Sequence, residues 1–161
     1  MPQTNQAQPR NWEQCQSAVQ TSRALEIAVA MVQGLNFEMM GRKLSEEKKW
    51  TEETLGQVES LYRKFLALNI LYPGRKICPT GPVDDFWHAH ILDTHAYEAD
   101  CKVLFGGILH HFPYFGMRGP EDKAALNAAF ADTTKLFVLH FGIDPTAGDT
   151  EARSCSPQRC P

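Results

Sequence analysis

The chain has 161 residues, 43% of them hydrophobic, and a formal net charge of −3. A chain of this length can bury most of its apolar surface in one core, so we expect one globular domain. Its 16 basic and 19 acidic residues are interspersed, which argues against nucleic acid and anionic membranes as partners. No apolar run reaches the roughly 18 residues of a membrane span, and the N-terminus lacks the apolar segment of a signal peptide. We therefore expect a cytoplasmic protein.

The N-terminal third of the chain predicts one long helix and little else. Residues 1–10 are polar and carry two prolines, so we expect a disordered lead-in. From Asn11 to Gly34 apolar residues recur at helical spacing, with a possible break at Thr21 and Ser22. Residues 35–50 mix apolar and charged side chains around Gly41, and we expect a loop there with a short helical turn at Ser45.

Three further helices are predicted between Thr51 and Gly142. The first begins at Thr51 as N-cap and ends before Pro73 and Gly74, and an extended connector follows. The next runs from about residue 83 to 104 and is closed by Gly106 and Gly107, and the last begins at Pro120. Strand patterns are almost absent. The predicted fold is all-α, a single domain of about four main helices packed as an irregular bundle over residues 11–143.

The cysteines and the C-terminal segment form a separate question. Five cysteines without a CxxC pair argue against a disulfide framework and a zinc knuckle, so those within the domain are expected to be core residues. Residues 144–161 are small, polar and rich in proline, which predicts a flexible tail with disordered character. Cys155 and Cys160 lie in this tail, where nothing structural requires them.

Five of the six histidines lie between residues 88 and 111, which makes this stretch the candidate site. On one regular helix His88 and His90 point to nearly opposite sides, because each residue advances by about 100°. Two faces result. One face carries Asp84, His88, Ile91 and His95, and the other carries His90, Thr94, Tyr97 and Cys101.

Asp84 and His88 lie one helical turn apart and could bind a metal ion together. A third ligand would come from His110 or His111 beyond the glycine turn. Three protein ligands with an open position are typical of a catalytic zinc or non-haem iron site, so the candidate cofactor is zinc or iron. The alternatives are a hydrogen-bonded structural network of the same residues and a metal-free acid–base site.

The run Val83-Asp84-x-x-Trp87-His88-x-His90, followed by Tyr97 and Asp100-Cys101, resembles the glycine-rich-domain-containing-protein-like family in its short bacterial form. The phrases FLALNILYPG, HILDT and LHHFPYFG extend the resemblance over about residues 50–118. The resemblance implies that the family-type positions are Asp84, Trp87, His88, His90, Tyr97, Asp100, Cys101 and one of His110 and His111. Of these, we expect Trp87, His90, Tyr97, Asp100 and Cys101 to support the site or stabilise the fold around it. It implies no activity, and RNA-linked roles of longer members do not transfer because this chain has no glycine-rich segment.

Three functions are compatible with these patterns. The first is a metal-binding protein, of hydrolase or oxygenase type, with its site on the Trp-His-x-His helix. The second is a non-catalytic interaction or scaffold module in which the cluster only stabilises the fold. The third is a folded recognition domain that presents the tail to a modifying enzyme, as precursors of peptide natural products do, with Cys155 and Cys160 as modification sites.

Overall fold

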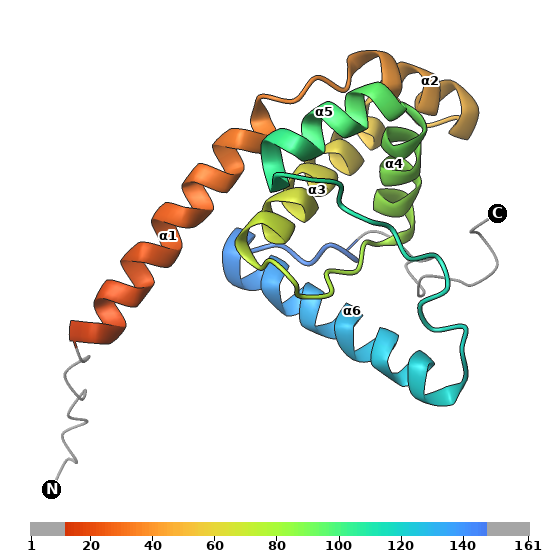
Figure 1. Cartoon of the computed structure of the whole chain (residues 1–161). Helices are drawn as coiled ribbons and strands as arrows, with labels where there is room; N and C mark the ends of the chain where they lie inside the picture. Colours follow the sequence, from red (N-terminus) through yellow and green to blue (C-terminus); the bar gives the residue numbers. More distant parts are fainter. Residues whose placement is uncertain (1–11, 148–161) are drawn as a thin grey trace, which may run out of the picture.

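A long central helix organises the fold, and the other helices pack around it (Figure 1). The structure is a computed structural model; it describes residues 12–147, with side chains from Gln20 onward. All regular secondary structure in this range is helical, which confirms the all-α prediction. The elements are α1 (Trp12–Gln33), α2 (Glu38–Lys48), α3 (Glu52–Leu71), α4 (Gly81–Leu92), α5 (Thr94–Phe105) and α6 (Pro120–Phe141).

The central helix is α3, and its sequence explains its position. Thr51 is the N-cap, because its hydroxyl oxygen accepts a hydrogen bond from the amide of Thr54 at 3.1 Å. Its apolar residues are buried on more than one side, and Tyr62 and Phe65 are fully buried. The helix therefore packs against α1, α2 and α4 at once.

Aromatic rings join α3 to the helix that carries the candidate site. The ring of Phe86 in α4 lies 5.0 Å from that of Tyr62, and the ring of Trp87 lies 5.0 Å from that of Phe65. Phe37, just before α2, contacts both Tyr62 and Phe86. Such ring pairs contribute about 0.5–1.5 kcal/mol each beyond their buried area. They fix the rotation of α4 about its axis, and with it the direction of each histidine.

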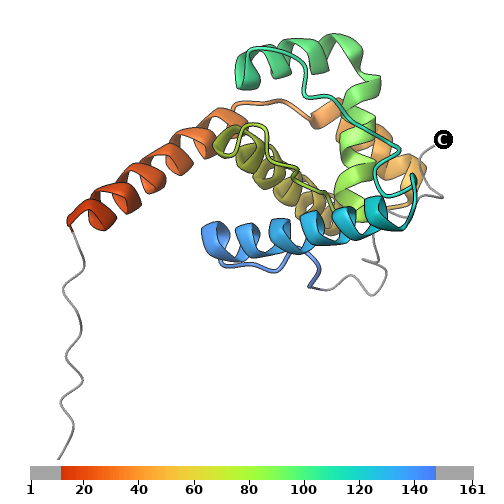
Figure 2. The ribbon, with the colours of Figure 1, turned by 60° about the horizontal axis from the view of Figure 1, so that its bottom comes forward.

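The last helix, α6, is attached to the body by the connector between α3 and α4. The amide of Cys78 donates to the hydroxyl of Thr133 at 2.9 Å, and the Tyr72 hydroxyl lies 2.6 Å from His140 Nε2. Leu136 and Phe137 complete the attachment by entering the core. Figure 2 shows α6 running across the body beside α3. The predicted helix from Pro120 to Gly142 is confirmed.

The single helix predicted for residues 83–104 is wrong. Asp93 has a non-helical backbone, with φ −81° and ψ 72°, and its carboxylate accepts a hydrogen bond from the amide of Ala96 at 3.4 Å. The residue thus ends α4 and caps α5, because a short acidic side chain competes for backbone amides. The chain turns at this point (Figure 1). His95 is exposed on α5, so it does not share a face with Asp84 and His88 as predicted.

The loop predicted for residues 35–50 is also wrong, because it contains α2. The side-chain oxygen of Asn36 accepts from the amide of Glu38 at 3.0 Å at the start of this helix. Gly41, which suggested a break, is buried, and a Cβ atom there would lie 3.4 Å from Leu55 Cδ2. Its small size serves helix packing. The described part of the chain therefore has six helices instead of four.

The first helix is continuous through Thr21 and Ser22, so no break occurs. Among its described side chains, which begin at Gln20, Ala28 and Val32 are buried in the core. The N-terminal half of the helix projects from the body (Figures 1 and 2). The predicted lead-in at residues 1–10 and the tail cysteines Cys155 and Cys160 lie outside the described residues. Within residues 12–147 no helix has the length and apolar character needed to cross a membrane.

Candidate metal site

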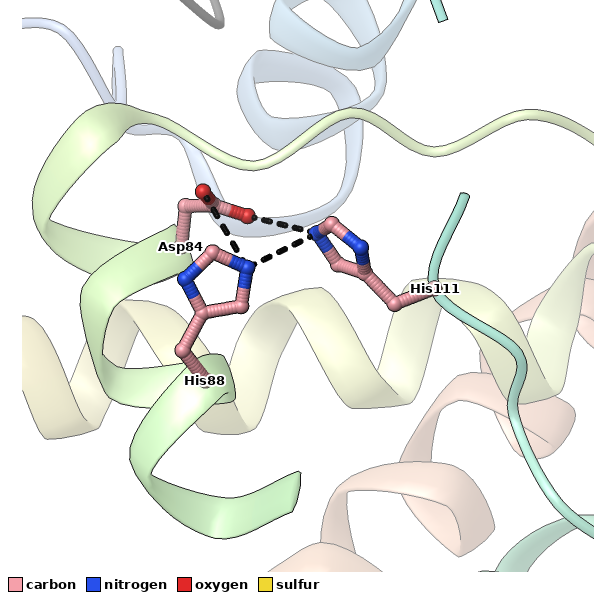
Figure 3. A group of neighbouring side chains, drawn as sticks. All are labelled: Asp84, His88 and His111. Atoms are coloured by element: carbon pink, nitrogen blue, oxygen red, sulfur yellow. Dashed lines mark hydrogen bonds and ion pairs between the residues drawn. The ribbon is translucent and has the colours of Figure 1, made fainter. Parts of the chain in front are cut away.

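Three of the four predicted metal ligands come together in the structure. Asp84, His88 and His111 each direct a ligand atom toward the other two, and these atoms lie within 4.8 Å of one another (Figure 3). His88 Nε2 lies 3.1 Å from His111 Nε2, and His111 Nε2 lies 3.2 Å from Asp84 Oδ1. His88 Nε2 lies 3.8 Å from the second carboxylate oxygen, Asp84 Oδ2. The group could hold a metal ion, and ligation by these residues stays a prediction.

Helix α4 supplies two of these side chains. Its first turn is closed by the amide of Asp84, which donates to the carbonyl of Thr80 at 2.8 Å, and Pro82 occupies the position that proline favours at a helix start. Asp84 and His88 are one turn apart and therefore share a face. The next carboxylate, Asp85, forms an ion pair with Lys48 of α2 at 2.8 Å. Of these two neighbouring carboxylates, Asp84 is therefore the one available to the site.

The loop after α5 supplies the third side chain, and a hydrogen-bond chain sets its register. Gly106, in the left-handed conformation with φ 74°, ends α5. The Tyr97 hydroxyl accepts from Trp87 Nε1 at 3.0 Å and donates to the carbonyl of Leu109. The Trp87 ring then contacts the ring of His111, with 4.7 Å between centroids. These contacts bring His111 to α4.

His110, the other candidate from this loop, does not join the group. Its side chain is exposed, and it lies at the cavity beside the ligand set. The hydrogen-bonded loop brings His111 against Trp87 and Asp84 of α4, whereas His110 is not a member of the ligand group. Of the two loop histidines, His111 is the candidate ligand in the structure.

The two short contacts of the triangle in Figure 3 cannot each have a proton of their own. Each imidazole nitrogen either carries a proton or presents a lone pair, whereas the carboxylate only accepts. If His111 Nε2 carries the proton, that proton must serve both His88 and Asp84. If His88 Nε2 carries it, His111 presents a lone pair to the carboxylate at 3.2 Å. A cation at the centre removes this conflict, because all three groups can then act as lone-pair donors.

The spacing of the ligand atoms fits such a cation. Two ligand atoms at the usual zinc–nitrogen distance, in tetrahedral geometry, lie about 3.3 Å apart. The observed separations of 3.1, 3.2 and 3.8 Å bracket this value. Modest side-chain rotation would complete the geometry. The donor set of two imidazoles and one carboxylate suits zinc and ferrous iron alike.

His90 has a different environment on the opposite side of the same helix. It is 2% exposed, and both ring nitrogens are engaged: Nδ1 lies 2.8 Å from the Tyr62 hydroxyl and Nε2 lies 3.1 Å from Asp100 Oδ2. Since the carboxylate accepts, Nε2 carries the proton and Nδ1 accepts from Tyr62. Burial lowers the pKa of His90, and Asp100 opposes this shift only in part. The ring is a neutral structural element.

Cys101 is part of the same supporting layer. It is buried between α5 and the core, and burial raises the pKa of its thiol. A protonated, buried thiol is a poor nucleophile. Of the five residues predicted to support the site, Trp87, His90, Tyr97 and Cys101 are buried and Asp100 is half-buried. Trp87 and Tyr97 connect directly to the ligand loop.

A cavity of about 270 Å³ adjoins the ligand set, and sequence reasoning did not find it. Asp84, Trp87 and His111 form part of its wall, and the wall continues over the connector and the segment before α6. Two cationic residues of the connector, Arg75 and Lys76, also line it. The sequence contained one signal for this cavity: Arg75 and Lys76 lie in the connector, which leads directly into the first turn of α4.

A comparison with known proteins corrects the predicted family. No curated protein and no solved structure matches the chain. A family model described as UCP032817-like matches residues 29–146, which include α2 to α6 and all three candidate ligands. The predicted resemblance to the glycine-rich-domain-containing-protein-like family is wrong, because the matching model is that of another family. Since the match covers most of its length, the chain belongs to the UCP032817-like family.

Proposed function

We propose that this protein binds one zinc or iron ion through Asp84, His88 and His111 and carries out metal-assisted chemistry on a small molecule. The observation that carries the proposal is the convergence of three ligand atoms whose two short contacts cannot each have a proton of their own. His90 differs from this cluster, because each of its ring nitrogens has a complementary partner of its own.

Three protein ligands favour catalysis over a purely structural metal. Structural zinc sites are normally closed by four protein ligands, whereas catalytic sites keep a position for water or substrate. The side chains of His88 and His111 are 27% and 16% exposed, so water can reach the site. A bound zinc ion would lower the pKa of a coordinated water and polarise a substrate oxygen, and iron would bring the chemistry of oxygenases.

The adjacent histidines provide a matched experiment. Metal-stripped full-length protein is titrated with zinc, and separately with ferrous iron without oxygen, and bound metal is measured by elemental analysis. We expect one equivalent for the wild type. Loss of a ligand should weaken zinc binding at least about 100-fold in His88→Ala and His111→Ala. His110→Ala, which removes an exposed neighbour, should bind within about threefold of the wild type.

Two results would contradict the proposal. A metal-free wild type at saturating zinc would reduce the cluster to a structural role and favour the interaction or scaffold module. Equal losses in His110→Ala and His111→Ala would show that metal binds to the exposed loop, away from Asp84. In the scaffold case His88→Ala should lower the melting temperature with no change in metal content.

The recognition-domain alternative and the cytoplasmic location remain proposals beside this one. The tail proposal concerns Cys155 and Cys160, and intact mass of the protein from its native cell tests it directly. Unmodified cysteines in that sample would remove it.

A further inference from the structure

The cavity beside the ligand set has an apolar interior and a cationic mouth. Its inner wall includes Ile77, Trp87 and Leu126, all of which are buried. Phe115 lies on the wall formed by the segment before α6. Arg75, Lys76 and Arg118 line the cavity as well, and all three are exposed. A volume of about 270 Å³ is near the lower end of the range for small-molecule sites.

The segment that carries Phe115 is fixed in place, so the cavity is largely preformed. Gly116 has φ 90°, and a Cβ atom there would lie 2.5 Å from Leu126 Cδ2. Its amide donates to Asp122 Oδ2 at 2.6 Å. A glycine is required by both the conformation and the close approach to α6. Preformed walls reduce the cost of ordering when a ligand binds.

The three cations differ in how far their charge is already neutralised. The guanidinium of Arg118 donates to Asp122 at 2.7 Å, and this contact holds the pKa of Asp122 at about 2. Arg75 forms an ion pair with Asp132 at 3.5 Å. Lys76 has no carboxylate partner among the described side chains of residues 20–147, and its ammonium lies 4.2 Å from the centroid of the Phe115 ring. One positive charge at the mouth is thus left for a ligand.

The carboxylate lining the cavity, Asp84, does not offset this charge when metal is bound. A divalent ion at the site more than neutralises it, so the loaded cavity is lined by excess positive charge. An anionic ligand is therefore favoured over a neutral or cationic one of the same shape. The aromatic wall beside Lys76 favours a flat apolar body.

We propose that the cavity binds a small aromatic carboxylate, with its carboxylate group at Lys76 and its ring against Phe115. The inference rests on the proposed function, in which Asp84, His88 and His111 hold the metal beside the cavity. Lys76 is then a specificity-determining residue. A carboxylate fits better than a phosphate, because a dianion would need a second free cation and both arginines are engaged.

The test uses three probes of one size on the full-length, zinc-loaded protein: phenylacetate, its neutral amide phenylacetamide, and phenyl phosphate. Dissociation constants are measured by titration calorimetry for wild type, Lys76→Gln and Lys102→Gln. Lys102 is an exposed lysine on α5 and serves as the charge-matched control. We expect phenylacetate to bind about tenfold tighter than the amide, and Lys76→Gln alone to remove this advantage.

Several outcomes would overturn the inference: no binding of phenylacetate, equal binding in Lys76→Gln and wild type, or at least tenfold tighter binding of phenyl phosphate. If Lys76→Gln left phenylacetate binding unchanged while removal of the metal abolished it, the carboxylate would bind zinc instead. Zinc content is measured on every sample. If the protein held no zinc but bound phenylacetate in a Lys76-dependent way, the result would count against the proposed function only. If it held one equivalent of zinc but bound no probe, the result would count against this inference only.

Discussion

Two histidines of the Trp-His-x-His motif lie two residues apart on α4 and have opposite environments. His90 points into the core, where Tyr62 and Asp100 engage both of its nitrogens. His88 points to the partly exposed side, where it meets a second imidazole and a carboxylate that also contact each other. The partners of a histidine, and not the motif in which it lies, therefore distinguish a structural residue from a candidate ligand.

The largest predicted difference between the two sides is in stability. His90→Ala leaves the Tyr62 hydroxyl and the Asp100 carboxylate without their partner and opens a cavity in the core. We expect the free energy of unfolding to fall by about 3 kcal/mol or more. His88→Ala removes a partly exposed ring, and in metal-free protein it should cost about 1 kcal/mol or less. Urea unfolding with a chelator present measures both.

His95→Ala is the control for this comparison, because His95 is exposed on α5 and should change stability by no more than about 0.5 kcal/mol. If His88→Ala destabilised the metal-free protein as much as His90→Ala does, both histidines would be structural. The distinction between the two sides of α4 would then fail.

Local sequence signals were sufficient for much of the fold. The bounds of α3 and α6 follow from Thr51, Pro120 and the glycines beyond each helix, and the i, i+4 spacing places Asp84 beside His88. The break at Asp93 was missed because aspartate is compatible with both a helix interior and a cap. Helix α2 was missed because a glycine such as Gly41 can mark either a turn or a close contact between helices, and the sequence alone does not distinguish the two.

The choice between His110 and His111 could not be made from sequence. It depends on which residue of the loop faces α4, and a tertiary hydrogen bond from Tyr97 to the carbonyl of Leu109 fixes that. The cavity was missed for a related reason. Its wall combines the connector, α4 and the segment before α6, which are brought together only by packing.

The Tyr97 contact provides a prediction of intermediate size that links the two sides of α4. Tyr97→Phe removes the hydroxyl that joins Trp87 to the ligand loop, so His111 loses its positioning contact. We expect about 1–2 kcal/mol of lost stability and zinc binding weakened about tenfold. Tyr114→Phe, an exposed tyrosine of the same loop, should change neither quantity. Unchanged zinc affinity in Tyr97→Phe would mean that other contacts set the loop register.

The smallest predicted effect concerns His140 of α6, which pairs with a tyrosine as His90 does but lies away from α4. His140 Nε2 lies 2.6 Å from the Tyr72 hydroxyl, and burial lowers the pKa of His140 below its ordinary value of 6.5. Below about pH 6.5 the unfolded chain then binds protons that the folded chain rejects, so stability falls as the pH decreases. His90, whose pKa is shifted in the same direction, adds to this dependence.

Urea unfolding of metal-free protein at pH 7.5 and 5.5 measures the effect. His140→Gln should lose less stability over this interval than the wild type does, because its unfolded state no longer gains a proton at this position. The remaining pH dependence belongs in part to His90, which the substitution leaves in place. An unchanged pH dependence in His140→Gln would show that His140 titrates alike in both states, and that burial beside a tyrosine does not by itself keep a histidine neutral.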